Sequence, residues 1–514
     1  MPAGIAIAAS AVACSFIVEA IAVTRSAHRR AVTAVMLHLA AFAVVAAGCL
    51  AITGRLFFSL GATLVLIALL AIVGNAKYAS LREPLVFSDL SLFSQVFTHP
   101  RLYLPFLGLG KLLAVLAGIA AAFTAFMLEQ PVAAAQRGLA LAVGLVCLPL
   151  CLALAGRLPL TLHPYSDQRR FGFFATFSAY LINGLRARQR REFARAVDGG
   201  PYSASRPVSN DGAHPDVIVV QSESFFDARQ LGGQIASHPY AHFDRARREA
   251  FEQGQLHVPA WGANTMRSEF AMLTGLVPAE LGYARFYPYL FVRRACTSLA
   301  GFFRRAGYRT VAVHPYHADF FGRRRAFEHM HFERFLDIAH FEGAARVGPY
   351  IGDIAVADAL VALLEKADDK PVFTFAITME NHGPLHLEAV APGESHARHG
   401  LGEDAQWRDL TAYLRHVENA DQMIGKLIDC LRKRARPAIL CFYGDHVPAM
   451  SAVFNALGSQ PANSDYFIWR NFGTDSGERR DVDVESLGSA IQRAMTGAHS
   501  PRTGSHDELR QVLA

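Results

Sequence analysis

Long apolar stretches with almost no charge fill the first third of the chain, and five of them are long enough to cross a membrane. A single crossing needs about 20 residues. The first stretch contains Glu19 and has no basic leading segment, and another follows it at once, which favours a membrane helix over a signal peptide. We expect residues 1–156 to form an all-α transmembrane bundle of about five helices, not the buried helices of a soluble protein. The stretches lie at 3–24, 31–53, 57–75, 103–127 and 137–156.

Two polar segments beside these stretches are expected to lie at the membrane surface. Residues 77–101, between the third and fourth stretches, have the composition of a short interfacial helix. Residues 157–212 are expected to be a linker with an interfacial helix, whose apolar part at 171–185 dips into the membrane surface. Arginines are dense in this linker and after the first stretch, so the positive-inside rule would put both segments in the cytoplasm.

From residue 213 the pattern changes to short apolar strands separated by amphipathic helices. Fully apolar strands that alternate with helices are typical of a mostly parallel sheet covered on both faces. We expect an α/β domain over 213–497, followed by a polar tail at 498–514. The predicted strands are 216–221, 310–314, 372–378 and 438–443, and the predicted helices include 297–305, 354–365 and 410–433.

The composition excludes several classes of protein. With 52% hydrophobic and 18% charged residues in 514, the chain is neither disordered nor a charged repeat rod. The net charge of +6 is mild and no basic stripe with interleaved aromatics occurs, so we expect no nucleic-acid partner. The seven cysteines are scattered, which predicts neither a disulfide framework nor a cysteine-based metal site.

Polar side chains that can bind metal follow each of the four predicted strands. In parallel α/β sheets, ligands bind beyond the carboxyl ends of the strands. Carboxylates combined with imidazole suit Mn²⁺, Mg²⁺ or Zn²⁺, so a divalent metal site is predicted at this edge. In chain order the residues are Glu223, then His314 and His317, then Asn381 and His382, and finally Asp445 and His446.

A turn of small residues at 262–264 leads into an apolar helical segment and puts hydroxyl groups near a helix N-terminus. That end of a helix favours anions. Thr265 is typical there of a helix N-cap, but a threonine beside a divalent metal is also a competent nucleophile, because the metal lowers the hydroxyl pKa. Ser268 and Thr274 are the competing hydroxyls.

Five motifs occur in one order, and by them the chain resembles a known family. They are QSESFFD (221–227), NTMRSEFAMLTGL (264–276), HPYHADFFGR (314–323), TMENHGP (378–384) and YGDHVP (443–448). The resemblance is to the lipoteichoic acid synthase and phosphoglycerol transferase branch of the sulfatase / alkaline phosphatase-like superfamily. The sulfatase signature Cys/Ser-x-Pro-x-Arg is missing, which disfavours sulfate-ester hydrolysis. At Phe321 relatives often carry Trp or Tyr beside the substrate.

The resemblance implies a nucleophile and a metal site. Thr265 would be the nucleophile that holds phosphoglycerol covalently. Its oxygen would join Glu223, Asp445 and His446 in binding one divalent ion, Mn²⁺ or Mg²⁺ in most such proteins, with Zn²⁺ as a further candidate.

The same resemblance implies a substrate pocket. His382 would contact the phosphate or protonate a leaving oxygen, and Arg323 would bind the glycerophosphate. His314, His317 and Asn381 are further candidate members of this substrate-binding pocket.

The expected protein is a membrane-anchored phosphoglycerol transferase of the cell envelope, which moves glycerol phosphate from phosphatidylglycerol to a glycan or polymer acceptor. The substrates of relatives lie outside the cytoplasmic (inner) membrane, so the catalytic domain should face the periplasm, against the positive-inside pattern. Two alternatives stay open: a phosphoethanolamine transferase of the same superfamily, and a non-catalytic membrane sensor or transporter with a ligand-binding domain. The apolar stretches contain few ionisable residues, chiefly Glu19, His38 and Lys111, and this scarcity weakens the transporter alternative.

Overall fold

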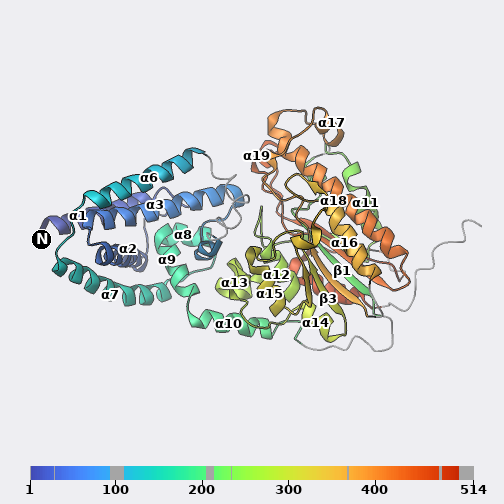
Figure 1. Cartoon of the computed structure of the whole chain (residues 1–514), viewed down its shortest axis with the longest axis horizontal. Coiled ribbons are helices and arrows are strands. Elements are labelled where there is room, and N and C mark those ends of the chain that lie inside the picture. The colour runs from blue at the N-terminus through green and yellow to red at the C-terminus, as the bar shows by residue number, and fades with distance from the viewer. Residues whose placement is uncertain are drawn as a thin grey trace, which may run out of the picture. The chain divides into compact units, whose positions relative to one another are not determined.

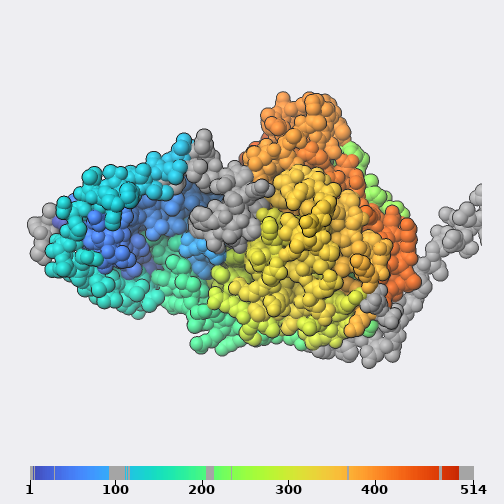
Figure 2. All heavy atoms as spheres, viewed as in Figure 1, coloured from blue at the N-terminus to red at the C-terminus, as the bar shows by residue number. Residues whose placement is uncertain are grey.

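The chain divides into two compact units in a computed structural model. The first contains Met1–Arg191 and Gly282–Phe286, and the second contains Glu192–Leu281 and Tyr287–Ala514. The residues left out of the description are grey in Figures 1 and 2, and the predicted tail at 498–514 lies among them. The structure describes residues 2–27, 29–92, 109–203, 214–232, 234–366, 370–473 and 477–496.

The N-terminal unit has an apolar helix at each of the five predicted stretches. Among the described residues, three of these helices are long and apolar enough to cross a membrane: α2, α3 and α7, with mean hydropathies of 2.4, 2.7 and 2.5. The described apolar parts of the other two, Ala6–Glu19 and Leu116–Leu128, are shorter. The helical region is therefore confirmed with three candidate spans. The five helices are α1 (Pro2–Glu19), α2 (Val32–Thr53), α3 (Leu56–Leu81), α6 (Leu109–Leu128) and α7 (Ala134–Arg157).

These helices are apolar on their outer faces as well as on their packed faces. Ile52 is 81% exposed and Val146 is 69% exposed, whereas Leu37 and Ile67 are fully buried. A helix that is apolar all round is typical of a membrane span, because lipid solvates its outer side chains.

The predicted surface segments differ from expectation. Helix α9 (Phe173–Gly184) covers most of the predicted 171–185 helix, but it is buried in this unit and packs on α2 and α7. Its sequence is mostly apolar with no charged residue, so burial within protein is favoured over an interface, which needs one polar face. Helix α10 (Ala187–Asp198) is the amphipathic one, and it buries Phe193 and Val197. The linker also contains α8 (Pro164–Phe171). The predicted 77–101 segment contains the 3₁₀ helix η1 (Phe87–Leu92), and residues 93–101 of that segment lie outside the described residues.

The second unit contains a nine-stranded sheet in the order β10-β2-β9-β8-β1-β7-β3-β4, with β11 paired to β2. The four predicted strands are β1, β3, β7 and β8, and they are parallel neighbours as expected. Strand β9 is antiparallel to both β8 and β2. The strands are β1 (Asp216–Ser222), β2 (Glu252–His257), β3 (Arg309–Val313), β4 (Arg334–Leu336), β7 (Val372–Ile377), β8 (Ala438–Gly444), β9 (Ser464–Arg470), β10 (Glu478–Arg479) and β11 (Val482–Asp483).

Helices cover both faces of the sheet (Figure 1). Alternate residues of β1, such as Ile218 and Val220, share a core with α11, α16 and α18 on one face. On the other face Phe303 of α14 stacks on Phe373 of β7, with ring centroids 4.5 Å apart. The helices are α11 (Ala241–Glu249), α12 (Met266–Thr274), α13 (Pro288–Phe291), α14 (Leu299–Arg305), α15 (Arg323–His329), α16 (Asp353–Glu365), α17 (Glu394–Arg398), α18 (Arg408–Arg432), α19 (Ser451–Ala456) and α20 (Leu487–Ala494), with a hairpin of β5 (Arg346–Val347) and β6 (Tyr350–Ile351).

Candidate active site

Three predicted metal ligands meet where the central strands end. Glu223 follows β1, and Asp445 and His446 follow β8, which pairs with β1 in parallel with Ser222 opposite Gly444. One ligand atom from each of the three side chains lies within 4.8 Å of the other two. All three residues are at most 5% exposed. The parallel register therefore brings two carboxylates and one imidazole into a single buried cluster.

Ser224 supports this cluster, and the sequence argument did not single it out. Its backbone N–H donates to Oδ1 of Asp445 at 2.8 Å. Its hydroxyl donates to Oε1 of Glu223 at 3.1 Å and lies 3.0 Å from Nε2 of His446. A φ of 54° turns the chain sharply at this residue. The available signal was a second serine directly after the carboxylate in Ser222-Glu223-Ser224.

The cluster has the properties of a cation site. Oδ2 of Asp445 and Nδ1 of His446 are buried and lie 2.8 Å apart as an ion pair, and neither atom has another partner among the residues that the structure describes. Burial and the adjacent Asp445 carboxyl raise the pKa of Glu223 to about 8. Burial alone would lower the pKa of His446, but Asp445 more than offsets it and the pKa is raised. A divalent cation would satisfy these buried atoms, and oxygen with imidazole nitrogen suits Mn²⁺, Mg²⁺ or Zn²⁺.

The segment that carries Thr265 is attached to this cluster on both sides. Before it, the backbone N–H of Gly262 donates to the carbonyl of Val447 at 2.9 Å. After it, the hydroxyl of Ser268 donates to the backbone carbonyl of Asp445 at 2.6 Å. Two hydrogen bonds to residues 445–447 thus hold the start of α12 beside the candidate metal ligands.

The three candidate hydroxyls of Thr265, Ser268 and Thr274 differ in their hydrogen bonds. Thr265 occupies the N-cap position and is 6% exposed, but its side chain makes no capping hydrogen bond within the described structure. Ser268 and Thr274 both donate to backbone carbonyls, Thr274 to Phe270 at 2.7 Å. Ser268 and Thr274 are thus each engaged with a backbone carbonyl, whereas the Thr265 hydroxyl does not cap its helix within the described structure.

Arg323 lies in a buried ion pair instead of an open pocket. Its guanidinium donates to Glu269 through Nε at 2.9 Å and through Nη2 at 3.0 Å, and the two side chains are 2% and 0% exposed. Glu269 also accepts a hydrogen bond from Tyr289 at 2.6 Å. The sequence argument missed Glu269, whose only signal was one carboxylate within the apolar α12 segment.

His314 packs against the same guanidinium. Its Nε2 lies 3.2 Å from Nη1 of Arg323, and its Nδ1 lies 3.3 Å from the carbonyl of Ile377. Burial and the positive charge of Arg323 hold the pKa of His314 well below its usual range. A neutral His314 accepts at Nε2 and donates at Nδ1, so it orients Arg323. His317, the neighbour predicted with it, is exposed.

His382 and Asn381 follow β7 at the same edge of the sheet. Nδ1 of His382 lies 2.7 Å from the carbonyl of Gly383, so this nitrogen carries the proton and Nε2 is left as a base. Burial lowers the pKa of His382 to about 4, and the charges of His446, Asp445 and Arg323 also act on it, as expected for a neighbour of the cluster. Asn381 is buried, and its Oδ1 has no hydrogen-bond partner in the described part of the chain.

Comparison with known proteins defines the class of the chain. Residues 215–496 match the sulfatase family, and the chain belongs to it. The superfamily predicted from the motifs is thereby confirmed, while the phosphoglycerol transferase branch stays a prediction.

Individual relatives cover different shares of the chain. It is 29% identical over 494 residues to the capsular polysaccharide biosynthesis protein RkpI of Rhizobium meliloti, across 92% of this chain and 85% of RkpI. It is 27% identical over 302 residues to a Rhizobium meliloti protein named for the modification of cyclic beta-1,2-glucan, across 59% of this chain and 46% of that relative. The lipooligosaccharide phosphoethanolamine transferase A (EptA) of Neisseria meningitidis has the same fold, with a TM-score of 0.54 and 14% identity across 86% of this chain and 88% of EptA.

Proposed function

We propose that the chain is a phosphoglycerol transferase, which moves glycerol phosphate from phosphatidylglycerol to a glycan or polymer acceptor. The observation that carries this proposal is the uncapped hydroxyl of Thr265, held beside the buried cluster of Glu223, Asp445 and His446. A free hydroxyl next to a cation site is the arrangement that covalent phosphoryl transfer requires.

In the first step Oγ1 of Thr265 attacks the phosphorus of phosphatidylglycerol. A phosphorus–oxygen bond to threonine forms, and the bond between phosphorus and the diacylglycerol oxygen breaks. The threonine proton ends on the leaving oxygen, so diacylglycerol departs and glycerophosphate stays on Thr265. Nε2 of His382 is the group proposed to carry this proton, because a proton on Nδ1, which faces the carbonyl of Gly383, leaves Nε2 as the base.

In the second step a hydroxyl of the acceptor attacks the same phosphorus. The bond to Thr265 breaks, and the proton of the acceptor returns to the threonine oxygen through His382. A divalent ion held by Glu223, Asp445 and His446 would lower the pKa of a nearby hydroxyl and offset phosphate charge. Arg323, kept cationic by Glu269, adds positive charge at the same edge, and the buried amide of Asn381 is available to a phosphate or glycerol group.

The membrane helices explain how the catalytic unit would reach its lipid donor. A catalytic unit tethered at a bilayer meets a phospholipid without a separate capture step. The acceptor is proposed to be a periplasmic or surface glycan, which agrees with the polysaccharide and glucan in the names of the two Rhizobium meliloti relatives. The catalytic unit would then face the periplasm.

The second candidate is transfer of phosphoethanolamine to a glycan or lipid. The similarity of fold to EptA over both the helical and the α/β regions supports it, since the same chain layout serves that head group there. The two proposals share the nucleophile and the metal site and differ in the head group of the donor lipid.

Release of diacylglycerol tests the function and separates the two head groups. Full-length protein in vesicles would receive labelled phosphatidylglycerol or phosphatidylethanolamine, each with Mn²⁺. We expect diacylglycerol from phosphatidylglycerol, none from Thr265→Ala, and release by Thr274→Ala, the matched hydroxyl control, because Thr274 donates only within α12. Release only from phosphatidylethanolamine would establish the second candidate, and release from neither lipid would refute both.

A further inference from the structure

A single buried imidazole touches both ends of the loop that carries His382. The loop follows β7, which ends at Ile377, and its segment between Glu380 and Glu388 carries His382. His416, on the neighbouring helix α18, lies between their carboxylates and is fully buried. Its Nδ1 is 2.9 Å from Oε1 of Glu380, and its Nε2 is 2.9 Å from both carboxylate oxygens of Glu388.

The geometry favours an imidazolium at His416. Each ring nitrogen faces a carboxylate, and an ionised carboxylate can only accept, so both ring nitrogens carry a proton when Glu380 and Glu388 are ionised. Burial alone would lower the pKa of His416, but Glu380 and Glu388 together raise it to about 9. One positive charge is thus shared between two carboxylates that are eight positions apart in the sequence.

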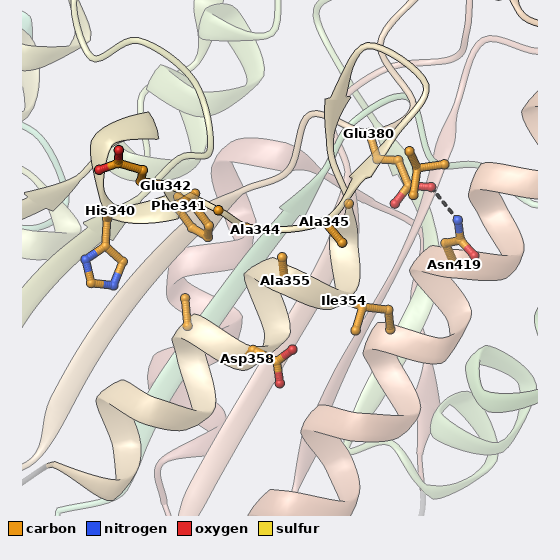
Figure 3. A pocket seen from close by; sticks show the side chains of 14 residues that line it. His340, Phe341, Glu342, Ala344, Ala345, Ile354, Ala355, Asp358, Glu380 and Asn419 are labelled. Atoms are coloured by element: carbon orange, nitrogen blue, oxygen red, sulfur yellow. Dashed lines mark hydrogen bonds between the residues drawn. The ribbon is translucent and has the colours of Figure 1, made fainter.

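Further groups fix the two carboxylates from the outside. At Glu380, Oε2 accepts the backbone N–H of Asp353 at 2.7 Å and Oε1 accepts from Asn419, on the wall of a cavity of about 520 Å³ (Figure 3). Burial and the charge of Glu380 hold the pKa of the Asp353 carboxyl well above its usual range. At Glu388, Oε2 accepts from Arg415 at 2.9 Å.

The loop itself has mostly local support. The backbone N–H of His382 donates to Met379, and that of Leu387 donates to Pro384. The His382 ring has one long contact outside the loop, 3.3 Å from its Nδ1 to the hydroxyl of Tyr350. Leu387 is 62% exposed, whereas Leu385 is buried in the core that includes α18. The position of His382 therefore depends on how the loop ends are held as well as on the packing of Leu385.

We infer that His416 is a positioning residue, which holds Glu380 and Glu388 together so that His382 stays beside Thr265 and the candidate metal ligands. It touches neither substrate nor metal ligand, and it acts through the loop. The inference rests on the proposed function in that His382 is the proton carrier. Its effect should fall on the chemical step, because a small displacement of a reacting group slows chemistry more than binding.

The chain offers a matched pair of variants. Glu388 and Glu394 both bond to Arg415, and their side chains are 10% and 11% exposed, but only Glu388 contacts His416. Glu388→Gln weakens the contact to His416, while Glu394→Gln removes a similar charge and leaves that contact intact. His416→Gln removes the imidazolium itself. If His416→Gln fails to fold, the comparison of the two glutamate variants still decides the question.

Two readouts on full-length protein test the inference. In the transfer assay, His416→Gln should lower kcat about 10-fold or more with little change in KM, Glu388→Gln should do the same more weakly, and Glu394→Gln should match wild type. Hydrogen exchange of the amides at 381–387 should be faster in the first two variants only. Wild type should lose this protection above about pH 9, and His416→Gln should show no such step.

The outcomes separate the inference from the proposed function. Equal effects of Glu388→Gln and Glu394→Gln, a parallel change in kcat and KM, or unchanged exchange in His416→Gln would each overturn it. Hydrogen exchange needs no turnover, so it reports on the loop even if wild type transfers neither head group. If wild type transfers neither head group but hydrogen exchange at 381–387 is still faster in His416→Gln and Glu388→Gln, the proposed function is refuted and the role of His416 in positioning the loop is supported.

Discussion

Replacing Glu269 with glutamine removes one charge from a deeply buried ion pair near the site. The side chains of Glu269 and Arg323 are 0% and 2% exposed and are joined by hydrogen bonds of 2.9 and 3.0 Å. Because the pair is buried, water cannot take the place of a lost carboxylate beside the guanidinium. Breaking such a pair by removing one partner costs about 3–5 kcal/mol. Glutamine keeps one acceptor oxygen, so we expect the lower end, about 3 kcal/mol.

Thermal unfolding of the full-length protein measures this cost. The unfolding entropy is about 2.1 cal/mol/K per residue, so one kcal/mol shifts the Tm of a unit of about 300 residues by roughly 1.6 °C. We therefore expect Glu269→Gln to lower the Tm of the α/β unit by about 5 °C. The control is Asp358→Asn, in an ion pair with Lys426 whose side chains are 59% and 39% exposed, where the expected loss is below about 1 kcal/mol. Equal melting temperatures for the two variants would refute the account of the buried pair.

Three further predictions concern the cluster, the pH range and the topology. Ser224→Ala removes the hydroxyl between Glu223 and His446, so calorimetry should show Mn²⁺ binding about 10–100-fold weaker, and unchanged affinity would contradict its supporting role. Folding raises the pKa of His416 from 6.5 to about 9, so its stabilisation, roughly 3 kcal/mol, is complete below pH 6.5 and is lost as the pH rises through about 9. Urea unfolding at pH 7 and pH 10 should show this loss in wild type but not in His416→Gln. A reporter fusion at Gly212 should be active in the periplasm, and activity confined to the cytoplasm would reverse the proposed orientation.

The sequence predicted the central strands but not the edge of the sheet. Strands β1 and β8 are largely apolar runs, a pattern typical of central strands that are covered on both faces of an α/β sheet. Strand β2, Glu252–His257, is polar, with alternating burial, and it was not predicted. Its neighbour β9 was not predicted either, although it is buried throughout. The pairing of β2 with β9 joins segments more than 200 residues apart, and such tertiary pairing overrides local propensity.

The same distinction holds for the site. Glu223, Asp445 and His446 could be predicted because parallel strands end at one edge and bring the following residues together. Glu269 and His416 could not, since each lies on a helix whose pattern also fits an ordinary packed face. Their partners, Arg323 and Glu380, are 54 and 36 positions away in the sequence, and only the fold makes them neighbours.

The central claim is that Thr265 forms a covalent bond to glycerophosphate taken from a lipid. Intact mass of the full-length protein after incubation with phosphatidylglycerol and Mn²⁺ tests it most directly, with Thr265→Ala beside it. The account predicts a mass increase of one glycerophosphate on wild type and none on the variant. An adduct of equal yield on Thr265→Ala would contradict the assigned nucleophile, and an adduct formed only from phosphatidylethanolamine would contradict the assigned donor.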